Sequence, residues 1–302
     1  MQIYLPIAEM SVNIFAVLLL GGVTGILSGL FGLGGGFLTT PFLIFMGIPP
    51  SIAVSSAANQ IIAASFSGFL AHWKKLNVDF KIGALLLVGG LIGSFLGILL
   101  FRWLKNIGQI DFTISVLYVT LLGGVGVLMA LDSYKTLAGK ALLLPSFPFK
   151  RWTEKLPWKM YFPRSKLTLS VWLPISIGIV SGIMVSVMGV GGGFFMIPAM
   201  IYLLGMPATI VVGTSLFQIV FITANVTFFH AVGTQTVDLV LAFLLICGSV
   251  IGAQIGSKVG DKVKGEHLRA MLALMIFLIA LRLLYGLFIT PENIYSISVS
   301  EL

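Results

Sequence analysis

The stretch FGLGGGFLTTPFLIFMGIP, residues 31–49, decides the fold, because it places a glycine cluster and a proline inside an apolar run. A close copy, MGVGGGFFMIPAMIYLLGMP, covers residues 188–207. Neither stretch continues into the Lys-Ser/Thr pair of a Walker loop, and neither has the downstream acid of a dinucleotide site. Both therefore need an explanation other than a nucleotide loop.

The composition predicts an all-α polytopic membrane protein. The 302 residues are 58% hydrophobic and only 9% charged, whereas globular domains average about 25% charged residues. No Asp, Glu, Lys or Arg occurs in residues 10–73 or 167–237. Each stretch exceeds the roughly 20 residues of one membrane-spanning helix. The leader has no Lys or Arg before residue 11, which is atypical of a cleavable signal, and the single Cys247 excludes a disulfide framework.

The chain contains two copies of one unit, which align over about 70 residues with only two single-residue shifts. Duplicated halves are typical of many transporter folds. Small-xxx-small glycine spacing in both copies predicts close helix contact, and an Asp in each copy is placed to cap a helix. The aligned pairs include Pro41/Pro198, Gln60/Gln218, His72/His230, Asp79/Asp238, Gly93/Gly252 and Gly97/Gly256.

Each copy has about five apolar segments, of which the second is too short to span a bilayer. We expect residues 1–131 to be the first transmembrane repeat and 132–168 a cytoplasmic loop rich in basic and aromatic residues. Residues 169–290 are then the second repeat, and 291–302 a C-terminal tail. The expected segments are 12–31, 36–46, 51–72, 82–101 and 110–131 in the first copy, and 170–188, 193–204, 209–230, 237–257 and 268–289 in the second. Ser51 and Thr209 are placed to act near the start of the third segments.

The distribution of basic residues favours copies with inverted topology. With an odd number of crossings per copy, the loop 73–81, the central loop and the loop after the ninth segment all face one side. Those three loops hold every Lys and Arg except Arg102, Lys105 and Arg282. Cytoplasmic loops are enriched in Lys and Arg, so the central loop is predicted to be cytoplasmic and both termini periplasmic. The basic and aromatic residues 144–166 suit the headgroup layer better than a nucleic acid.

The glycine breaks are interpreted as a binding site. A helix broken inside lipid leaves backbone groups unpaired, which is tolerated only where protein or a water-filled cavity supplies partners. Corresponding breaks in two repeats mark transporter sites, and the helices that restart there favour anions. The predicted ligand contacts, glycines and neutral polar residues alike, are Gly34, Gly35, Gly36, Ser55, Ser56, Asn59, Gln60, Gly191, Gly192, Gly193, Thr214, Ser215 and Gln218.

The polar residues near the breaks are neutral, so the sequence favours a small anion over a cation. For each Ser or Thr, hydrogen bonding between helices accounts for the residue equally well. His72 and His230 end the third segments and suit either a proton-linked gate or a membrane-interface position. The sequence leaves open coupling to protons or another ion, and whether the chain forms a homo-oligomer.

The sequence bears on three classes of function: an intramembrane enzyme, an anion channel and a secondary carrier. An intramembrane enzyme is not expected, because HExxH and GxSxG motifs are absent and the three histidines are scattered. Neither a metal nor a cofactor is therefore expected. An anion channel is not excluded by the sequence. A secondary carrier with alternating access between the two copies is the main hypothesis.

The stretch GLFGLGGGFLTTPFLIFMGIPPSIAVSSAANQ, residues 29–60, and its second copy resemble the sulfite exporter TauE/SafE family, also called the 4-toluene sulfonate uptake permeases. The resemblance covers nearly the whole chain. It implies a permease of the bacterial inner membrane for sulfite, an organosulfonate or a related sulfur oxyanion, while another small organic anion stays open. Residues and charge predict only a small anion; the sulfur chemistry is implied by the resemblance alone.

Overall fold

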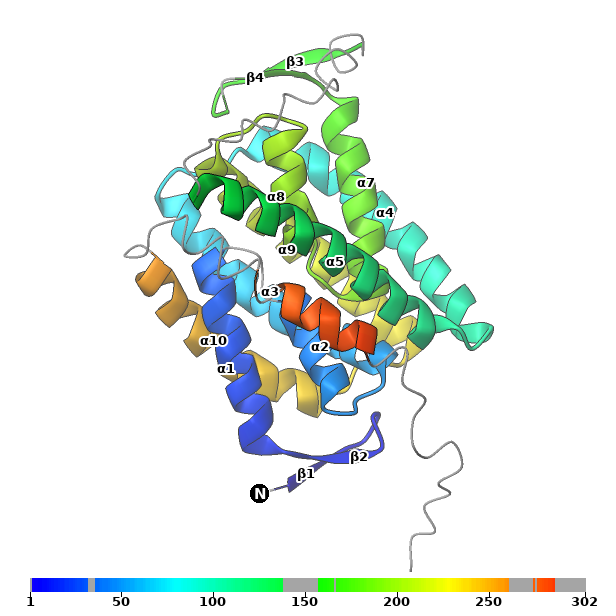
Figure 1. Cartoon of the computed structure of the whole chain (residues 1–302). Helices are drawn as coiled ribbons and strands as arrows, with labels where there is room; N and C mark the ends of the chain where they lie inside the picture. Colours follow the sequence, from blue (N-terminus) through cyan, green and yellow to red (C-terminus); the bar gives the residue numbers. More distant parts are fainter. Residues whose placement is uncertain are drawn as a thin grey trace, which may run out of the picture.

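The computed structural model describes residues 2–31, 36–137, 157–165, 167–260, 274 and 276–285. The predicted contacts Gly34 and Gly35, most of the central loop and the tail 291–302 lie outside the described residues. The described part is a helical bundle with two short β-hairpins (Figure 1). The prediction of an all-α polytopic architecture is confirmed, with these hairpins as an addition.

Both halves contain the same order of elements. The first half consists of β1 (Gln2–Leu5), β2 (Met10–Asn13), α1 (Ile14–Phe31), α2 (Gly36–Phe45), α3 (Pro50–Lys74), α4 (Phe80–Asn106) and α5 (Ile110–Leu137). The second half consists of β3 (Lys159–Phe162), β4 (Leu167–Ser170), α7 (Trp172–Met188), α8 (Gly193–Tyr202), α9 (Ala208–Phe229), the π-helix η1 (His230–Thr234), α10 (Leu239–Gly260) and a helix over Ile276–Tyr285.

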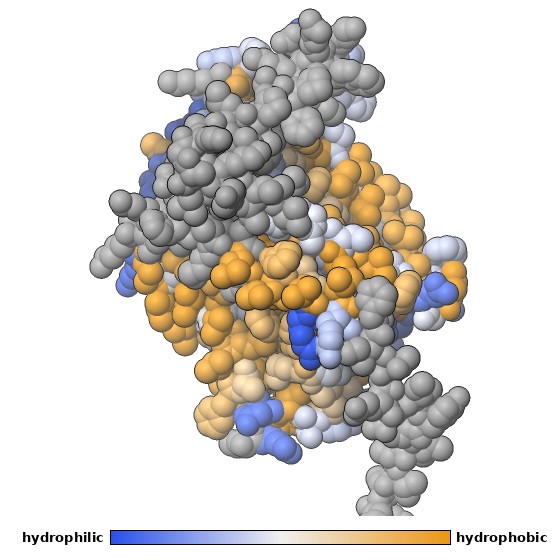
Figure 2. Space-filling view, viewed as in Figure 1, coloured by the Kyte–Doolittle hydropathy of each residue, from blue (hydrophilic) through white to orange (hydrophobic). Residues whose placement is uncertain are grey.

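Four described helices are long and apolar enough to cross a membrane: α3, α4, α9 continued through η1, and α10. Apolar side chains dominate the middle of the face seen in Figure 2. In contrast, α2 and α8 have 10 residues each, about 15 Å at 1.5 Å per residue, half of a roughly 30 Å hydrocarbon core. Neither short helix can cross the bilayer by itself.

Glycines bring the first helix of each half against the fourth helix of the other half. A methyl group on Gly93 of α4 would overlap the carbonyl oxygen of Ile179 in α7, and one on Gly252 of α10 would overlap that of Gly22 in α1. Gly93 and Gly252 are aligned positions, and so are their partners. The predicted close contact at these glycines is confirmed, and α1–α10 and α4–α7 are equivalent pairs.

Each hairpin contacts the half to which it does not belong. Asp79 caps α4 through the N–H groups of Lys81 and Ile82, and its second oxygen accepts from the Ser165 hydroxyl at 2.7 Å in the β3–β4 turn. Asp238 likewise accepts from two N–H groups of α10, while its second oxygen accepts from Ile7 N–H at 3.0 Å in the β1–β2 turn. The predicted caps are confirmed, and the hairpins lie at opposite ends of the bundle (Figure 1).

Several boundaries differ from the sequence expectation. Helix α5 continues through Leu137, beyond the expected end at 131, and the β3–β4 hairpin begins inside the expected loop 132–168. Residues 10–13 form β2, so the first helix starts at Ile14 and not at 12. The expected capping by Ser51 is wrong: Pro49 precedes α3, and the Ser51 N–H donates to Asp111 Oδ1 of α5 at 3.0 Å. Pro207 precedes α9, and the Thr209 side chain lies outside the described residues.

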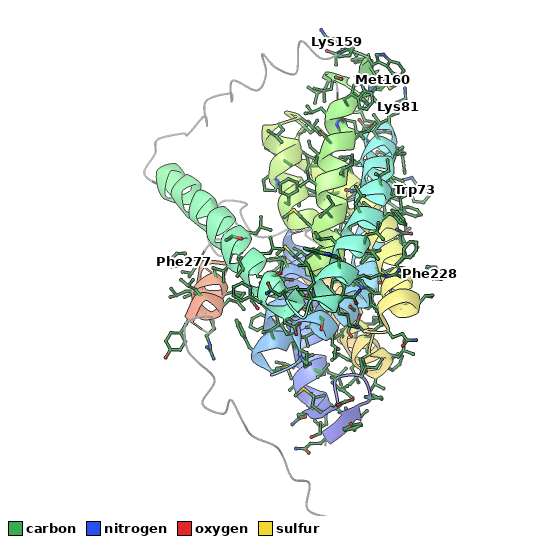
Figure 3. The ribbon with its side chains drawn as sticks, turned by 90° about the vertical axis from the view of Figure 1, so that its right-hand side faces the viewer. Trp73, Lys81, Lys159, Met160, Phe228 and Phe277 are labelled. Atoms are coloured by element: carbon green, nitrogen blue, oxygen red, sulfur yellow. The ribbon has the colours of Figure 1, made fainter. Side chains whose placement is uncertain are left out.

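Two basic residues of different predicted cytoplasmic loops lie at one end of the bundle. Figure 3 shows Lys81, at the start of α4, at the same end as Lys159 of β3. The β1–β2 hairpin lies at the other end. This arrangement agrees with the grouping of basic residues on which the orientation was predicted.

Candidate functional site

The two glycine breaks lie against one another inside the bundle. A methyl group on Gly36, where α2 begins, would lie 2.9 Å from the carbonyl oxygen of Gly189, where α7 has ended. The same methyl would overlap Ile61 of α3, and one on Gly191 would lie 2.9 Å from the Ile61 side chain. The two breaks are about 150 residues apart in sequence, yet both lie against the buried Ile61 of α3, the residue that follows Gln60.

The second break is described in full, and its backbone needs glycine. Gly189, Gly191 and Gly192 have φ angles of 65°, 74° and 72°, a left-handed region that other residues rarely adopt. The carbonyl of Met188, at the end of α7, accepts a hydrogen bond of 2.7 Å from the Tyr118 hydroxyl of α5. Protein groups thus satisfy part of the interrupted backbone, as is required in a bilayer.

The start of α8 presents backbone donors. Its first intrahelical hydrogen bonds run from Phe195 and Met196 N–H to the Gly192 carbonyl, so earlier N–H groups of this turn have no carbonyl partner within the helix. Gly192 has no side chain to cap them. The hydroxyl of Ser181 in α7 lies 2.6 Å from the position that a Gly192 Cβ would take. The positive end of a helix dipole and a hydroxyl therefore meet at the break.

Gln60 of α3 is completely buried and bonded on one side only. Its Nε2 donates to Thr24 Oγ1 at 2.8 Å. The Thr24 hydroxyl donates to the Leu20 carbonyl at 2.8 Å, so its single hydrogen is used and it must accept from Gln60. This fixes the amide orientation and leaves Gln60 Oε1 without a partner among the described residues.

Gln218 of α9 is also completely buried, and neither Nε2 nor Oε1 has a partner in the described part of the chain. Its Nε2 lies 3.0 Å from the position that a Cβ on Gly90 of α4 would occupy. Gly90 in turn faces Gly182 of α7, the neighbour of Ser181. The two aligned glutamines therefore both face the interior but differ in hydrogen bonding.

Five other predicted contacts have structural hydrogen bonds. Ser56 and Thr214, which are aligned, accept the backbone N–H groups of Asp238 and Asp79. The Ser55 hydroxyl bonds Thr236 Oγ1 at 2.7 Å, and Asn59 and Ser215 bond carbonyls of their own helices. These side chains join the halves or satisfy their own helices, which leaves Gln60 and Gln218 as predicted side chains with unused polar atoms.

The two histidines differ in environment. His230 is completely buried, with Nε2 3.0 Å from the Ser186 carbonyl and Nδ1 3.1 Å from Thr234 Oγ1. Thr234 continues through Thr236 to Ser55, with oxygen–oxygen distances of 2.8 and 2.7 Å. His72 lies two residues before the end of α3 and is partly exposed. The aligned histidines thus differ in burial, and His230 enters a hydroxyl chain that reaches the site helix α3.

The chemistry offered at the breaks is neutral hydrogen bonding. The glutamines, Ser181 and the glycine backbone carry no charge, and no group of three His, Cys, Asp or Glu suited to a metal occurs among the residues with described positions. Backbone N–H groups, an amide NH2 and a hydroxyl are donors that suit oxyanions.

Comparison with known proteins decides the family. The family model described as "Sulfite exporter TauE/SafE" matches residues 17–283. The chain belongs to the sulfite exporter TauE/SafE family. The match includes both glycine breaks and all the site helices, so the resemblance found in the sequence is confirmed, and the chain is a membrane transporter by family.

Among the curated relatives of this TauE/SafE-family chain are two Bacillus subtilis proteins, each named a probable membrane transporter protein. YjnA is 29% identical over 269 residues, covering 89% of this chain and 99% of YjnA. YunE is 24% identical over 282 residues, covering 90% and 98%. A Xylella fastidiosa protein of the same description is 26% identical over 235 residues, covering 77% and 79%. No solved structure matches.

Sequence reasoning missed Thr24, Ser181 and Tyr118 of this TauE/SafE-family chain. Thr24 and Ser181 lie in the first segments, at positions that correspond when residues 32–36 are aligned with 189–193. Extending the alignment ten residues backwards would have paired them. No comparable signal marks Tyr118, because its contact with Met188 depends on how α5 crosses α7.

Proposed function

We propose that this protein is a secondary transporter for a small sulfur-containing oxyanion, such as sulfite or an organosulfonate. The ligand binds between the two glycine breaks, where Gln60 and Gln218 face the interior. Access alternates as the two halves rock about this site. The family name supplies the sulfur chemistry, and the neutral donor groups favour an anion.

One observation carries the proposal: a methyl group on Gly36 would lie 2.9 Å from the Gly189 carbonyl oxygen, so the two glycine breaks lie next to each other. Broken helices at bilayer depth are tolerated where they line a binding cavity. Completely buried amide atoms without protein partners supply a second argument, because such atoms cost about 1–3 kcal/mol each when nothing binds them. Of these atoms, Gln218 Nε2 would donate to a bound oxyanion, whereas the Oε1 atoms of Gln60 and Gln218 are acceptors.

The proposed location is a bacterial inner membrane, with the central loop cytoplasmic and both termini periplasmic. The grouping of Lys81 and Lys159 at one end, opposite the β1–β2 hairpin, supports this orientation. The proposal includes no cofactor and no catalytic step.

Uptake of radiolabelled sulfite, thiosulfate and taurine into proteoliposomes tests the function. Parent protein is compared with Gly192→Leu, Gly35→Leu, Gln60→Leu and Gln218→Leu. We expect saturable uptake of at least one anion by the parent and its loss in the variants, at equal amounts of reconstituted protein. Leucine variants with parental uptake would place the site elsewhere.

The alternative is an anion channel. Counterflow separates the two: a carrier loaded with unlabelled anion accumulates label transiently, whereas a channel only equilibrates it. High single-channel conductance with no counterflow would replace the carrier by a channel.

A further inference from the structure

We infer that Ser181 and Thr24, one from the first helix of each half, are ligand-binding residues that act with Gln218 and Gln60, and that Ser181 and Gln218 form the open subsite in this structure. The ligand of this subsite is a small oxyanion. This inference rests on the proposed function, and it adds two residues and a difference between the halves.

The two hydroxyl–amide pairs occupy equivalent positions but are in different states. In the first half, Thr24 and Gln60 are joined at 2.8 Å, and the Thr24 hydrogen is given to the Leu20 carbonyl. In the second half, the Ser181 hydroxyl and both polar atoms of Gln218 have no partner among the described residues. Ser181 is 1% exposed and Gln218 0%, so bulk water does not satisfy them. The first pair is closed and the second is open.

The Ser181 hydroxyl of the open pair lies at a helix start that can bind an anion. The Ser181 hydroxyl is next to Gly192, the residue before α8, and the 10-residue helix α8 has no side-chain cap. Any side chain at Gly192 would meet the Ser181 oxygen, so glycine keeps this place free. The Ser181 O–H, the Gln218 NH2 and first-turn N–H groups of α8 are all donors. An oxyanion accepts from all three, and the Gln218 Oε1 acceptor is left for a ligand hydrogen or a water molecule.

The hydrogen bond between Thr24 and Gln60 explains why the first half does not offer a second subsite of the same kind. Thr24 Oγ1 already accepts from Gln60 and donates to its own helix, so this pair retains the Gln60 Oε1 acceptor and no free donor of Thr24. Because the halves have equivalent elements, the inference includes a second state in which the two pairs are exchanged. In that second state Ser181 bonds Gln218, and Thr24 releases Gln60 to the ligand. Alternating access would exchange the two pairs.

The first test measures the concentration dependence of uptake with the three anions named above. Ser181→Ala is compared with Ser181→Thr, which restores a hydroxyl, and with Ser176→Ala on the same helix, whose hydroxyl bonds the Leu173 carbonyl. We expect Ser181→Ala to raise the half-saturating concentration about tenfold or more, as for a lost hydrogen bond to a charged ligand. Ser176→Ala, at an exposed position, should stay within about twofold of the parent. Ser181→Thr should return the half-saturating concentration toward the parental value, because the hydroxyl is restored.

The outcomes separate the two proposals. If the parent takes up none of the three anions, the proposed function fails and this inference fails with it. If the parent takes one up and Ser181→Ala keeps the parental half-saturation, only the inference is overturned.

A labelling test gives a readout other than transport. Cys247 is the only cysteine, so Ser181→Cys and Ser176→Cys are made in a Cys247→Ser background. The reagent is methanethiosulfonate ethylsulfonate, itself a small sulfonate. We expect it to label Ser181→Cys, and saturating transported anion to slow that labelling several-fold while leaving Ser176→Cys unchanged. Labelling of Ser181→Cys that the anion does not slow would overturn the inference.

Discussion

The backbone N–H of Asp238 donates to the Ser56 hydroxyl at 3.0 Å, across the boundary between the two halves. The aligned pair, Asp79 N–H and Thr214 Oγ1, has the same length. Each bond joins the start of a fourth helix to the third helix of the other half. The two halves are therefore joined by two equivalent hydrogen bonds, one at the start of each fourth helix.

Removing either aspartate should destabilise the fold. Asp79→Ala and Asp238→Ala each lose a helix cap and a bond to a hairpin turn, and we expect a loss of about 1–3 kcal/mol for each. The apparent melting temperature in detergent measures it. Asp111→Ala, whose bond to Ser51 N–H is exposed, is the control with a smaller loss. Equal effects at all three positions would contradict the importance of burial.

The glycines between α4 and α7 and between α1 and α10 should not tolerate even a methyl group. Gly93→Ala and Gly252→Ala place a Cβ against a backbone carbonyl, and overpacking of this kind costs about 1–3 kcal/mol or more. The yield of monodisperse protein should fall. Gly123→Ala in α5 meets nothing within 4 Å and should express as the parent. Normal yield of both helix-interface variants would mean that the helices can separate freely.

The aligned tyrosines of the two hairpins should be reachable from opposite sides of the membrane. Tyr4 and Tyr161 are 60% and 56% exposed, and their hairpins lie at opposite ends of the bundle. In a Cys247→Ser background, an impermeant thiol reagent added to intact cells should label Tyr4→Cys and not Tyr161→Cys. Inside-out vesicles should give the reverse. Labelling of both from one side would refute the inverted topology.

His230 should matter more than His72 for stability. His230→Ala removes two buried ring contacts, with Ser186 and Thr234, and leaves a cavity against Phe101, whose ring centre is 4.5 Å away. We expect a loss of about 2–4 kcal/mol. His72→Ala, at a partly exposed position, should lose less than about 1 kcal/mol. The apparent melting temperatures of the two alanine variants compare their losses of stability. Equal losses would contradict the expected contribution of the hydroxyl chain at His230.

Most of the helical architecture could be predicted from the sequence, because bilayer physics is strict about length and hydrophobicity. The short helices, the aspartate caps and the glycine contacts follow from spacing and duplication. The hairpins could not be predicted in this way. Residues 10–13 and 167–170 alternate between apolar and polar residues over only four positions, the shortest run in which alternation indicates a strand. The turns of the two hairpins are bonded to Asp238 and Asp79, about 230 and 90 residues away in sequence.

The site was predictable at the level of regions and less so at the level of side chains. Glycine breaks mark the place because few structures tolerate them in lipid. Whether a particular Ser or Thr has a hydrogen free depends on its three-dimensional neighbours. Ser56 and Thr214 accept hydrogen bonds from backbone N–H groups of the other half, whereas the Ser181 hydroxyl has no hydrogen-bond partner among the described residues. Sequence spacing within one helix contains no information about such partners.

In each half, the fourth helix packs against the first helix of the other half. Neither copy of the duplicated chain therefore packs as a separate unit. One contacting group consists of α1, α10 and the β1–β2 hairpin, and the other consists of α4, α7 and the β3–β4 hairpin. Each of these groups contains elements from both copies. A chain cut between the copies would therefore separate α1 from α10 and α4 from α7, and would leave the glycines of both contacts without the helix against which they pack.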